Sequence, residues 1–255
     1  MSQSMKGLLW KEWRMMRSFF IGMIVLCTVL FIFMSMNSGV YESLVGMITL
    51  GLIIIPASLL FSLNMEVNNI QNFLHIPQPA HKLILAKILY SMFISILYMG
   101  FLIMLLTVMD AIYDNTVFTF TGAVLYYGYI FLSLIIISMF PAAILLFMWT
   151  VHQIWKKYIH TLSIVVILAL LFIFGKFERF MSETAFYQTF THWGKVSIAG
   201  LIPDGGGSRI NGELVISNEL LIFHNAYVGT FIFYGLIVII LYVFSIQLME
   251  RRVEG

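Results

Sequence analysis

Long uninterrupted apolar runs constrain the fold of this chain more than any other feature. A membrane-spanning helix needs about 20 apolar residues, whereas the strands of a membrane barrel alternate apolar and polar residues. The runs here are continuous, and they predict six spanning helices, at Ser18–Met36, Leu44–Leu63, Leu83–Met109, Phe118–Val151, Tyr158–Gly175 and Ala226–Met249. The fourth run is too long for one upright crossing, so we expect it to tilt or to extend beyond the membrane, with Pro141 as a candidate kink.

The composition excludes several classes of protein. Of the 255 residues, 61% are apolar and 10% are charged, whereas soluble domains carry about 25% charged residues. A soluble enzyme, a disordered protein and a nucleic-acid binder are therefore excluded. We expect an all-α, polytopic membrane protein in which residues 1–255 form a single transmembrane domain. The single cysteine, Cys27, excludes an intramolecular disulfide and any cysteine-based metal site.

Six spans define two sides of the membrane, and the basic residues are unevenly distributed between these sides. The side with both chain ends has ten, and the other side has four. The first set is Lys6, Lys11, Arg14, Arg17, Lys82, Lys87, Lys156, Lys157, Arg251 and Arg252, and the second is Lys176, Arg179, Lys195 and Arg209. Cytoplasmic segments carry the excess of lysine and arginine, so both termini and the loop 152–157 are predicted to be cytoplasmic. Glu12 and Glu66 fall on the same side.

The sequence lacks the motifs and the placement of ionisable residues that catalysis or ion coupling requires. The chain has no phosphate-binding loop and no His-Glu-x-x-His zinc motif. None of the six predicted spans has an ionisable residue near its centre, which argues against a secondary transporter and against a channel with a charged filter. We expect no catalytic residue, no metal site and no cofactor in this chain. If it transports, its energy comes from elsewhere.

The N-terminal segment, residues 1–17, is predicted to be an interfacial helix. Met5, Leu9, Trp13, Met16 and Phe20 recur at near-helical spacing on one face. Lysine and arginine, including Arg14 and Arg17, lie away from that face and can reach anionic lipid headgroups, with Trp10 and Trp13 at headgroup level. The alternative is a simple positive-inside anchor.

Two connecting segments are unusually long. The cytoplasmic loop 64–82 contains Pro77 and Pro79, which break the chain after a short amphipathic helix formed by Val67, Ile70, Phe73 and Leu74. Such a helix is suited to dock into a soluble partner protein. The alternative is a helix that lies on the lipid surface without a partner. The extracellular segment 176–225 begins with an apolar pattern typical of a short outer helix and continues into a flexible turn at 203–208.

This order of elements resembles the permease subunits of ABC-2-type exporters. The residues that match the family pattern are Glu66, Phe73, Leu74, Pro77 and Lys87. Asn68, Asn69 and Asn72 replace the usual Gly-Thr and Glu of the pattern, and Gln78 with Pro79 departs from its small residues. The similarity in topology covers nearly the whole chain.

The resemblance implies a partner and a mechanism. In such exporters a coupling helix, here within the loop 64–82 with Ile70 among its residues, sits in a groove of a cytoplasmic ABC ATPase. ATP and Mg would bind that ATPase. Two permease subunits, as a dimer of this chain or with a paralogue, would form the path in a bacterial plasma membrane. The segment 176–225 would form short re-entrant helices near the outer leaflet.

The expected translocation path is apolar. Its predicted lining residues are Phe31, Phe33, Met34, Met36, Met47, Phe61 and Phe172. A lining without buried charge suits a hydrophobic or amphipathic cargo, because methionine adapts to varied apolar shapes. Small permeases of this family often export peptides, toxins or antibiotics and give immunity to them, which favours a peptide toxin or antimicrobial as substrate. An ABC exporter of a lipid or drug and an ion-gradient-driven secondary transporter are the alternatives.

Overall fold

The described part of the chain comprises residues 3–67, 79–112, 120–159, 163–197, 208–210, 213–215 and 225–253 of a computed structural model. Within these ranges the chain forms seven helices and four short strands. The helices are α1 (Gln3–Ser38), α2 (Val40–Val67), α4 (Ala80–Ile112), α5 (Phe120–Ile159), α6 (Ser163–Ser182), α7 (Ala185–Thr191) and α8 (Val228–Val253). The strands are β1 (Lys195–Ser197), β2 (Ser208–Ile210), β3 (Glu213–Val215) and β4 (Asn225–Tyr227).

Five helices, α1, α2, α4, α5 and α8, are long and apolar enough to cross a membrane. The chain is therefore a helical, multi-pass membrane protein, as the apolar runs predict. The second half of α6 carries Lys176, Glu178 and Arg179. Three charges so close together make α6 a poorer match to lipid than the other five, and the sixth crossing stays a prediction.

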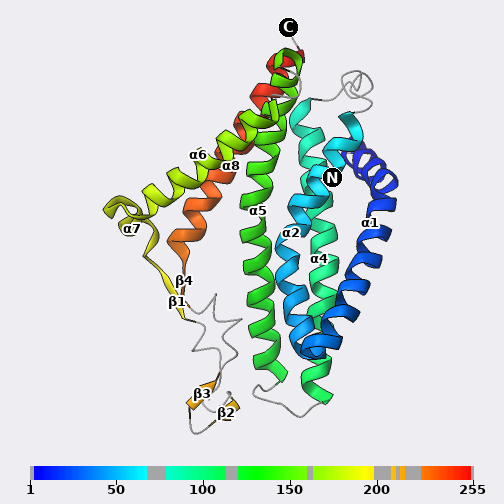
Figure 1. The fold of residues 1–255 in the computed structure, drawn as a ribbon, viewed down its shortest axis with the longest axis vertical. Helices are drawn as coiled ribbons and strands as arrows, with labels where there is room; N and C mark the ends of the chain where they lie inside the picture. The colour runs from blue at the N-terminus through cyan, green and yellow to red at the C-terminus, as the bar shows by residue number, and fades with distance from the viewer. Residues whose placement is uncertain are drawn as a thin grey trace.

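The helices form a bundle in which α2, α4 and α5 are central. Figure 1 shows α1 on one side of this centre and α6 with α8 on the other. α2 contacts α1, α4 and α5, and α8 packs along α5. We call the end of the bundle where α2 ends and α4 begins, at the top of Figure 1, the upper end. The ends of α5 and α8 lie there as well.

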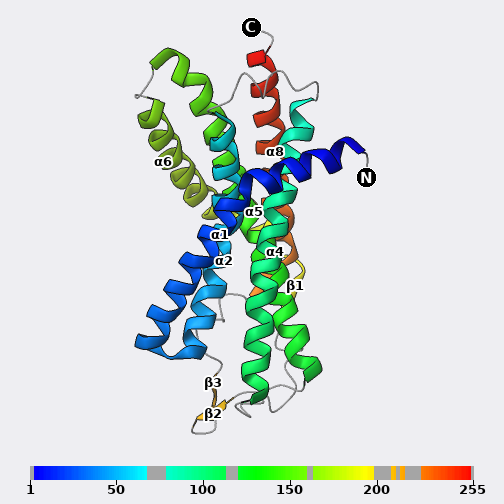
Figure 2. The ribbon, with the colours of Figure 1, turned by 90° about the vertical axis from the view of Figure 1, so that its right-hand side faces the viewer.

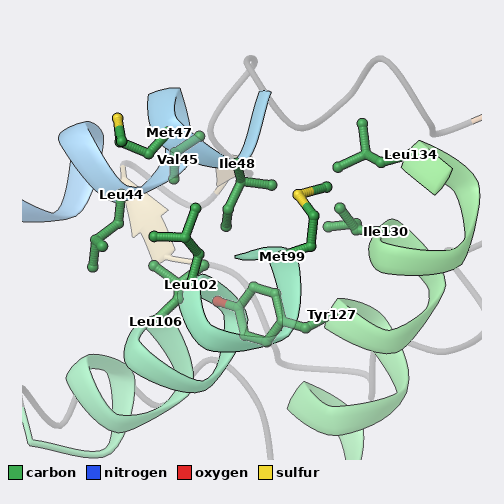
Figure 3. Packing of buried hydrophobic residues seen from close by; sticks show 10 residues of the cluster. All are labelled: Leu44, Val45, Met47, Ile48, Met99, Leu102, Leu106, Tyr127, Ile130 and Leu134. Carbon is green, nitrogen blue, oxygen red and sulfur yellow. The ribbon is translucent and has the colours of Figure 1, made fainter. Parts of the chain in front are cut away.

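The largest core cluster lies between α2, α4 and α5, toward the lower end of the bundle (Figure 3). Met99 of α4 packs there between Ile48 of α2 and Leu134 of α5. Burying these side chains against each other gains little over burying them in lipid tails, which are equally apolar. These core side chains contribute through close packing. Elsewhere along the α2–α4 contact, small residues allow the two helices to approach each other closely. The small residues are Ser58 and Ser62 of α2 and Ser91 and Ser95 of α4, all of which are buried.

The N-terminal segment is continuous with the first span, contrary to the expected division at residue 17. Figure 2 shows that the start of α1 runs across the bundle and that the helix then bends and descends beside α2. Its apolar face contacts protein rather than lipid, because Leu8 packs with Leu83 and Ala86, and Met16 packs with Ile94.

The prediction of a loop at residues 152–157 was wrong. These residues belong to α5, which continues to Ile159. Residues 142–159 contain neither glycine nor proline, and Val151 and Gln153 are buried against the bundle. Helical periodicity and packing therefore continue beyond the point where the hydropathy falls. The next helix is displaced in the same direction, since α6 runs past the predicted end at Gly175 to Ser182.

The long segment after α6 begins with a helix and contains paired strands. Thr184 accepts a hydrogen bond from the backbone N–H of Tyr187 and so caps the start of α7. β1 pairs antiparallel with β4, and β2 pairs antiparallel with β3. A short helix was predicted in this region, but the apolar residues expected to form it are divided between the end of α6 and α7, and the strands were not predicted. Most of the turn at 203–208 lies outside the described residues.

Candidate functional site

A cluster of charged side chains is buried near the upper end, where α1, α2 and α4 meet. Its members are Lys11 and Glu12 of α1, Ser62 and Glu66 of α2, and Lys87 of α4. Lys87 is 1% exposed, Glu12 is 4% exposed and Ser62 is fully buried. Charged groups this deeply buried need partners, because an unpaired charge away from water is very costly.

Lys87 and Ser62 organise the cluster. The Lys87 Nζ atom lies 2.9 Å from Glu12 Oε1 and 3.1 Å from Glu66 Oε2. It also donates to the Ser62 hydroxyl at 2.7 Å, and that hydroxyl in turn donates to Glu12 Oε2 at 2.6 Å. One ammonium, one hydroxyl and one carboxylate therefore form a closed ring of contacts. The contact with Glu66 lacks hydrogen-bond geometry and is an ion pair only.

Lys11 completes the cluster at its solvent-facing rim. Its Nζ atom bonds the other carboxylate oxygen of Glu66, and its side chain is 41% exposed. Two lysines and two glutamates give the cluster no net charge. Pairing and hydrogen bonding offset the desolvation of these groups, which makes the cluster a stable connection between three helices.

The helix ends next to the cluster have further polar links. The Trp149 indole N–H of α5 donates to the Asn64 side chain of α2 at 3.0 Å. The Tyr242 hydroxyl of α8 donates to the His81 backbone carbonyl of α4 at 3.2 Å. The end of α2 and the start of α4 are thus bonded to α1, α5 and α8. These two helix ends flank residues 68–78.

The predicted coupling residues are only partly within the described chain. Glu66 and Lys87 are brought together by the cluster. Ile70, Phe73, Leu74 and Pro77 lie outside the described residues, and their role stays a prediction.

The residues that were predicted to lie at the lipid headgroups are on an outward face of α1. Trp10 is 63% exposed, and Trp13, Arg14 and Arg17 are also exposed. Lys11 was expected to face lipid headgroups, but it points toward Glu66, because the carboxylate at the bundle edge offers it a buried partner.

The seven predicted path residues do not come together in one place. Met47 is buried in the core cluster, with Phe31 and Met34 packed against it. Phe61 stacks near Phe19, at 4.7 Å between ring centroids. The remaining three are exposed on outer helices, Phe33 and Met36 on α1 and Phe172 on α6. Their lining role stays a prediction.

A cavity of about 650 Å³ lies elsewhere, between α4, α5 and α8, and Glu178 of α6 is part of its wall. The Tyr234 hydroxyl of α8 donates to Glu178 Oε1 at 3.0 Å. Among the described residues, no group of three or more histidine, cysteine or acidic side chains could hold a metal ion.

No family model, curated protein or solved structure matches this chain.

Sequence reasoning missed Glu12 and the cavity. A signal for Glu12 was present, because Leu8, Glu12 and Met16 follow each other at four-residue spacing on the apolar face of the first helix. A lone acid on such a face indicates a basic partner on another helix. The cavity had no comparable signal, since its residues come from four separate helices and from strand β4.

Proposed function

We propose that this chain is the membrane permease subunit of an ATP-driven ABC exporter, working with a separate cytoplasmic ATPase. The observation that carries the proposal is the linkage of the helix ends that flank residues 68–78. Glu66 and Asn64 connect the end of α2 to α1 and α5, and Lys87 and His81 connect the start of α4 to α1 and α8. A displacement of the connecting loop is thereby transmitted to most of the bundle.

In this proposal the upper end of the bundle faces the cytoplasm of a bacterial cell. α6 provides the sixth pass together with the segment that follows it, so both termini are cytoplasmic. ATP and Mg bind the partner ATPase, and closure of its two subunits pushes the loop that contains Phe73. A second copy of this chain, or a paralogue, completes the path.

The proposed cargo is a hydrophobic or amphipathic peptide toxin or antimicrobial, with a lipid or drug as the alternative. Support comes from the apolar character of the bundle and of its cavity. Export of such a compound gives the cell immunity to it.

The proposal predicts that a neighbouring gene encodes an ABC ATPase, and the experiment that tests it is co-expression with that ATPase, followed by purification through a tag on this chain. We expect a stable complex whose ATP hydrolysis is stimulated by substrate peptide. Phe73→Ala should abolish the stimulation, because it removes an apolar contact from the coupling helix. Glu66 is a poor first choice for alanine substitution, since it also stabilises the bundle through Lys87.

A matched control for Phe73→Ala is Phe93→Ala, which removes an exposed phenylalanine from the middle of α4. That variant should keep wild-type stimulation. A complex that fails to form, or a Phe73→Ala variant with full stimulation, would contradict the assignment of the coupling loop.

One observation favours the secondary transporter as a second candidate. Glu12 and Glu66 are buried carboxylates inside a membrane bundle, and proton-coupled carriers use groups of this kind. Their location near one end of the bundle and their full set of lysine partners favour a structural connection instead. A carrier would continue to transport after ATP depletion and would stop when the proton gradient is collapsed, whereas an ABC exporter shows the opposite dependence.

A further inference from the structure

We infer that the cavity between α5 and α8 is a binding site for a monovalent organic cation with a bulky apolar body, whose positive charge pairs with Glu178. The inference rests on the proposed function only in treating this ligand as a substrate. Binding itself requires neither the ATPase nor transport.

The shape and lining of the cavity suit the apolar body of such a ligand. Its volume of about 650 Å³ falls within the usual range of small-molecule sites, about 300–1,000 Å³. α5 contributes Ile135 and Met139, and α8 contributes Phe231 and Val238. A site that is mostly apolar with a few polar groups is typical of ligand pockets.

Among the residues that the structure describes, Glu178 supplies the only charged group in the cavity wall. One of its carboxylate oxygens accepts the hydrogen bond from Tyr234, whose hydroxyl lies 3.4 Å from the Tyr187 hydroxyl. In the described part of the chain, Glu178 takes part in no ion pair, and the neighbouring Arg179 is paired with Glu183 instead. The negative charge of Glu178 is therefore oriented by tyrosine and not neutralised by a basic side chain.

Aromatic rings and a proline add to the preference for a cation. The Phe140 and Tyr234 rings meet edge to face with centroids 4.7 Å apart, and both line the cavity. The face of an aromatic ring attracts a cation. Pro141 has no N–H to donate to the Ile137 carbonyl one turn earlier, which leaves an additional acceptor next to the cavity.

The position along the bundle distinguishes this site from a surface contact. The residues that α5 contributes, 135–141, lie at the middle of that helix. A carboxylate beside the middle of a spanning helix is costly in lipid and marks a binding or transport site. An apolar cation could enter laterally from the membrane and compensate that charge.

The test is binding of tritiated tetraphenylphosphonium to the full chain in phosphatidylcholine nanodiscs, measured by equilibrium dialysis with excess unlabelled cation to define the specific part. We expect one saturable site per chain. Glu178→Gln should weaken binding by about tenfold or more, since it removes the charge and keeps the side-chain shape. Glu250→Gln is the matched control, because it removes an exposed acid of α8 that does not line the cavity and leaves the Arg179–Glu183 pair intact.

A steric variant tests the location independently of charge. A Cβ atom added at Gly235 would meet no atom beyond its own helix backbone within 4 Å, so a side chain there begins in open space at the cavity wall. Gly235→Leu should therefore fold and abolish binding by filling the site. Gly100→Leu, at an equally open glycine on α4 away from the cavity, should bind as wild type.

Tetraphenylborate, an anion of nearly the same shape, is the matched ligand control and should show no saturable binding. Wild-type affinity in Glu178→Gln or Gly235→Leu, equal binding of the anion, or the absence of a saturable component would overturn the inference. Any of these results leaves the permease proposal standing, whereas failure of the ATPase complex to form leaves cation binding standing.

Discussion

The ammonium group of Lys87 lies 2.9 Å from the carboxylate of Glu12, although 75 positions separate the two residues in the chain. Both side chains are almost completely buried. The pair joins the N-terminal helix to the start of α4, and Ser62 adds α2 through its hydroxyl. The bundle thus contains a buried polar connection at the point where three helices meet.

Replacement of Lys87 by methionine should strongly destabilise the protein. The substitution keeps the length of the side chain but leaves Glu12 and Glu66 buried without their shared cation. Breaking a buried pair in this way costs about 3–5 kcal/mol. We expect a clear decrease in the thermal unfolding midpoint in mild detergent, followed by the loss of monodisperse protein.

Two further variants test whether the loss is electrostatic. Adding Glu12→Gln to Lys87→Met should recover part of the stability, since the remaining amide carries no charge. Lys6→Met, which removes an exposed lysine from the same helix as Glu12, should leave the midpoint unchanged. An unchanged midpoint in Lys87→Met would mean that the cluster does not stabilise the bundle.

Gly229→Ala should loosen the contact between α7 and α8. A methyl group at Gly229 would lie 2.7 Å from the Thr191 backbone oxygen and 2.8 Å from the Phe190 backbone oxygen, so backbone must shift to admit it. Overpacking of this kind costs about 1–3 kcal/mol. We expect a lower unfolding midpoint by differential scanning fluorimetry.

The control for this prediction is Gly235→Ala, six positions further along the same helix. No atom lies within 4 Å of the added methyl group there. Alanine is also the better helix former, by about 1 kcal/mol. This variant should be as stable as the wild type or more so, and equal midpoints for the two alanine variants would contradict the close approach at Gly229.

The sequence predicts the central helices well and their polar connections poorly. Long apolar runs predict α2, α4 and α8 to within about four residues at either end, because each run is bounded by polar or charged residues. The turn between α5 and α6 was predicted too early, since no glycine or proline marks it. The ring formed by Lys87, Ser62 and Glu12 depends on how three helices pack, and no local pattern encodes that arrangement.

Anionic lipid should stabilise the protein through the outward face of α1. Arg14 and Arg17 are exposed beside Trp13, and Glu12, the acid next to them, is turned inward. Basic side chains at a membrane surface attract anionic headgroups. Adding phosphatidylglycerol should raise the unfolding midpoint of the wild type in mixed micelles. The Arg14→Gln, Arg17→Gln double variant should lose most of this increase.

The specificity of the phosphatidylglycerol effect can be checked by removing a basic residue from a different helix. Lys156→Gln removes an exposed basic residue from α5 and should keep at least most of the lipid-dependent increase. If the arginine double variant responds to phosphatidylglycerol like the wild type, this face does not bind anionic lipid.

The orientation of the chain can be determined by cysteine labelling. Cys27 is the only natural cysteine, so a Cys27→Ser background leaves one thiol for each introduced position. Ser208 lies at the start of β2, toward the lower end of the bundle, and Lys156 lies near the upper end of α5. In the proposed orientation, Ser208→Cys should react with a membrane-impermeant maleimide in intact cells, whereas Lys156→Cys should react only after lysis.

The reverse pattern would invert the topology and place the segment 68–78 outside the cell, out of reach of a cytoplasmic ATPase. Labelling of both positions in intact cells would contradict a six-pass arrangement in which these two positions lie on opposite sides.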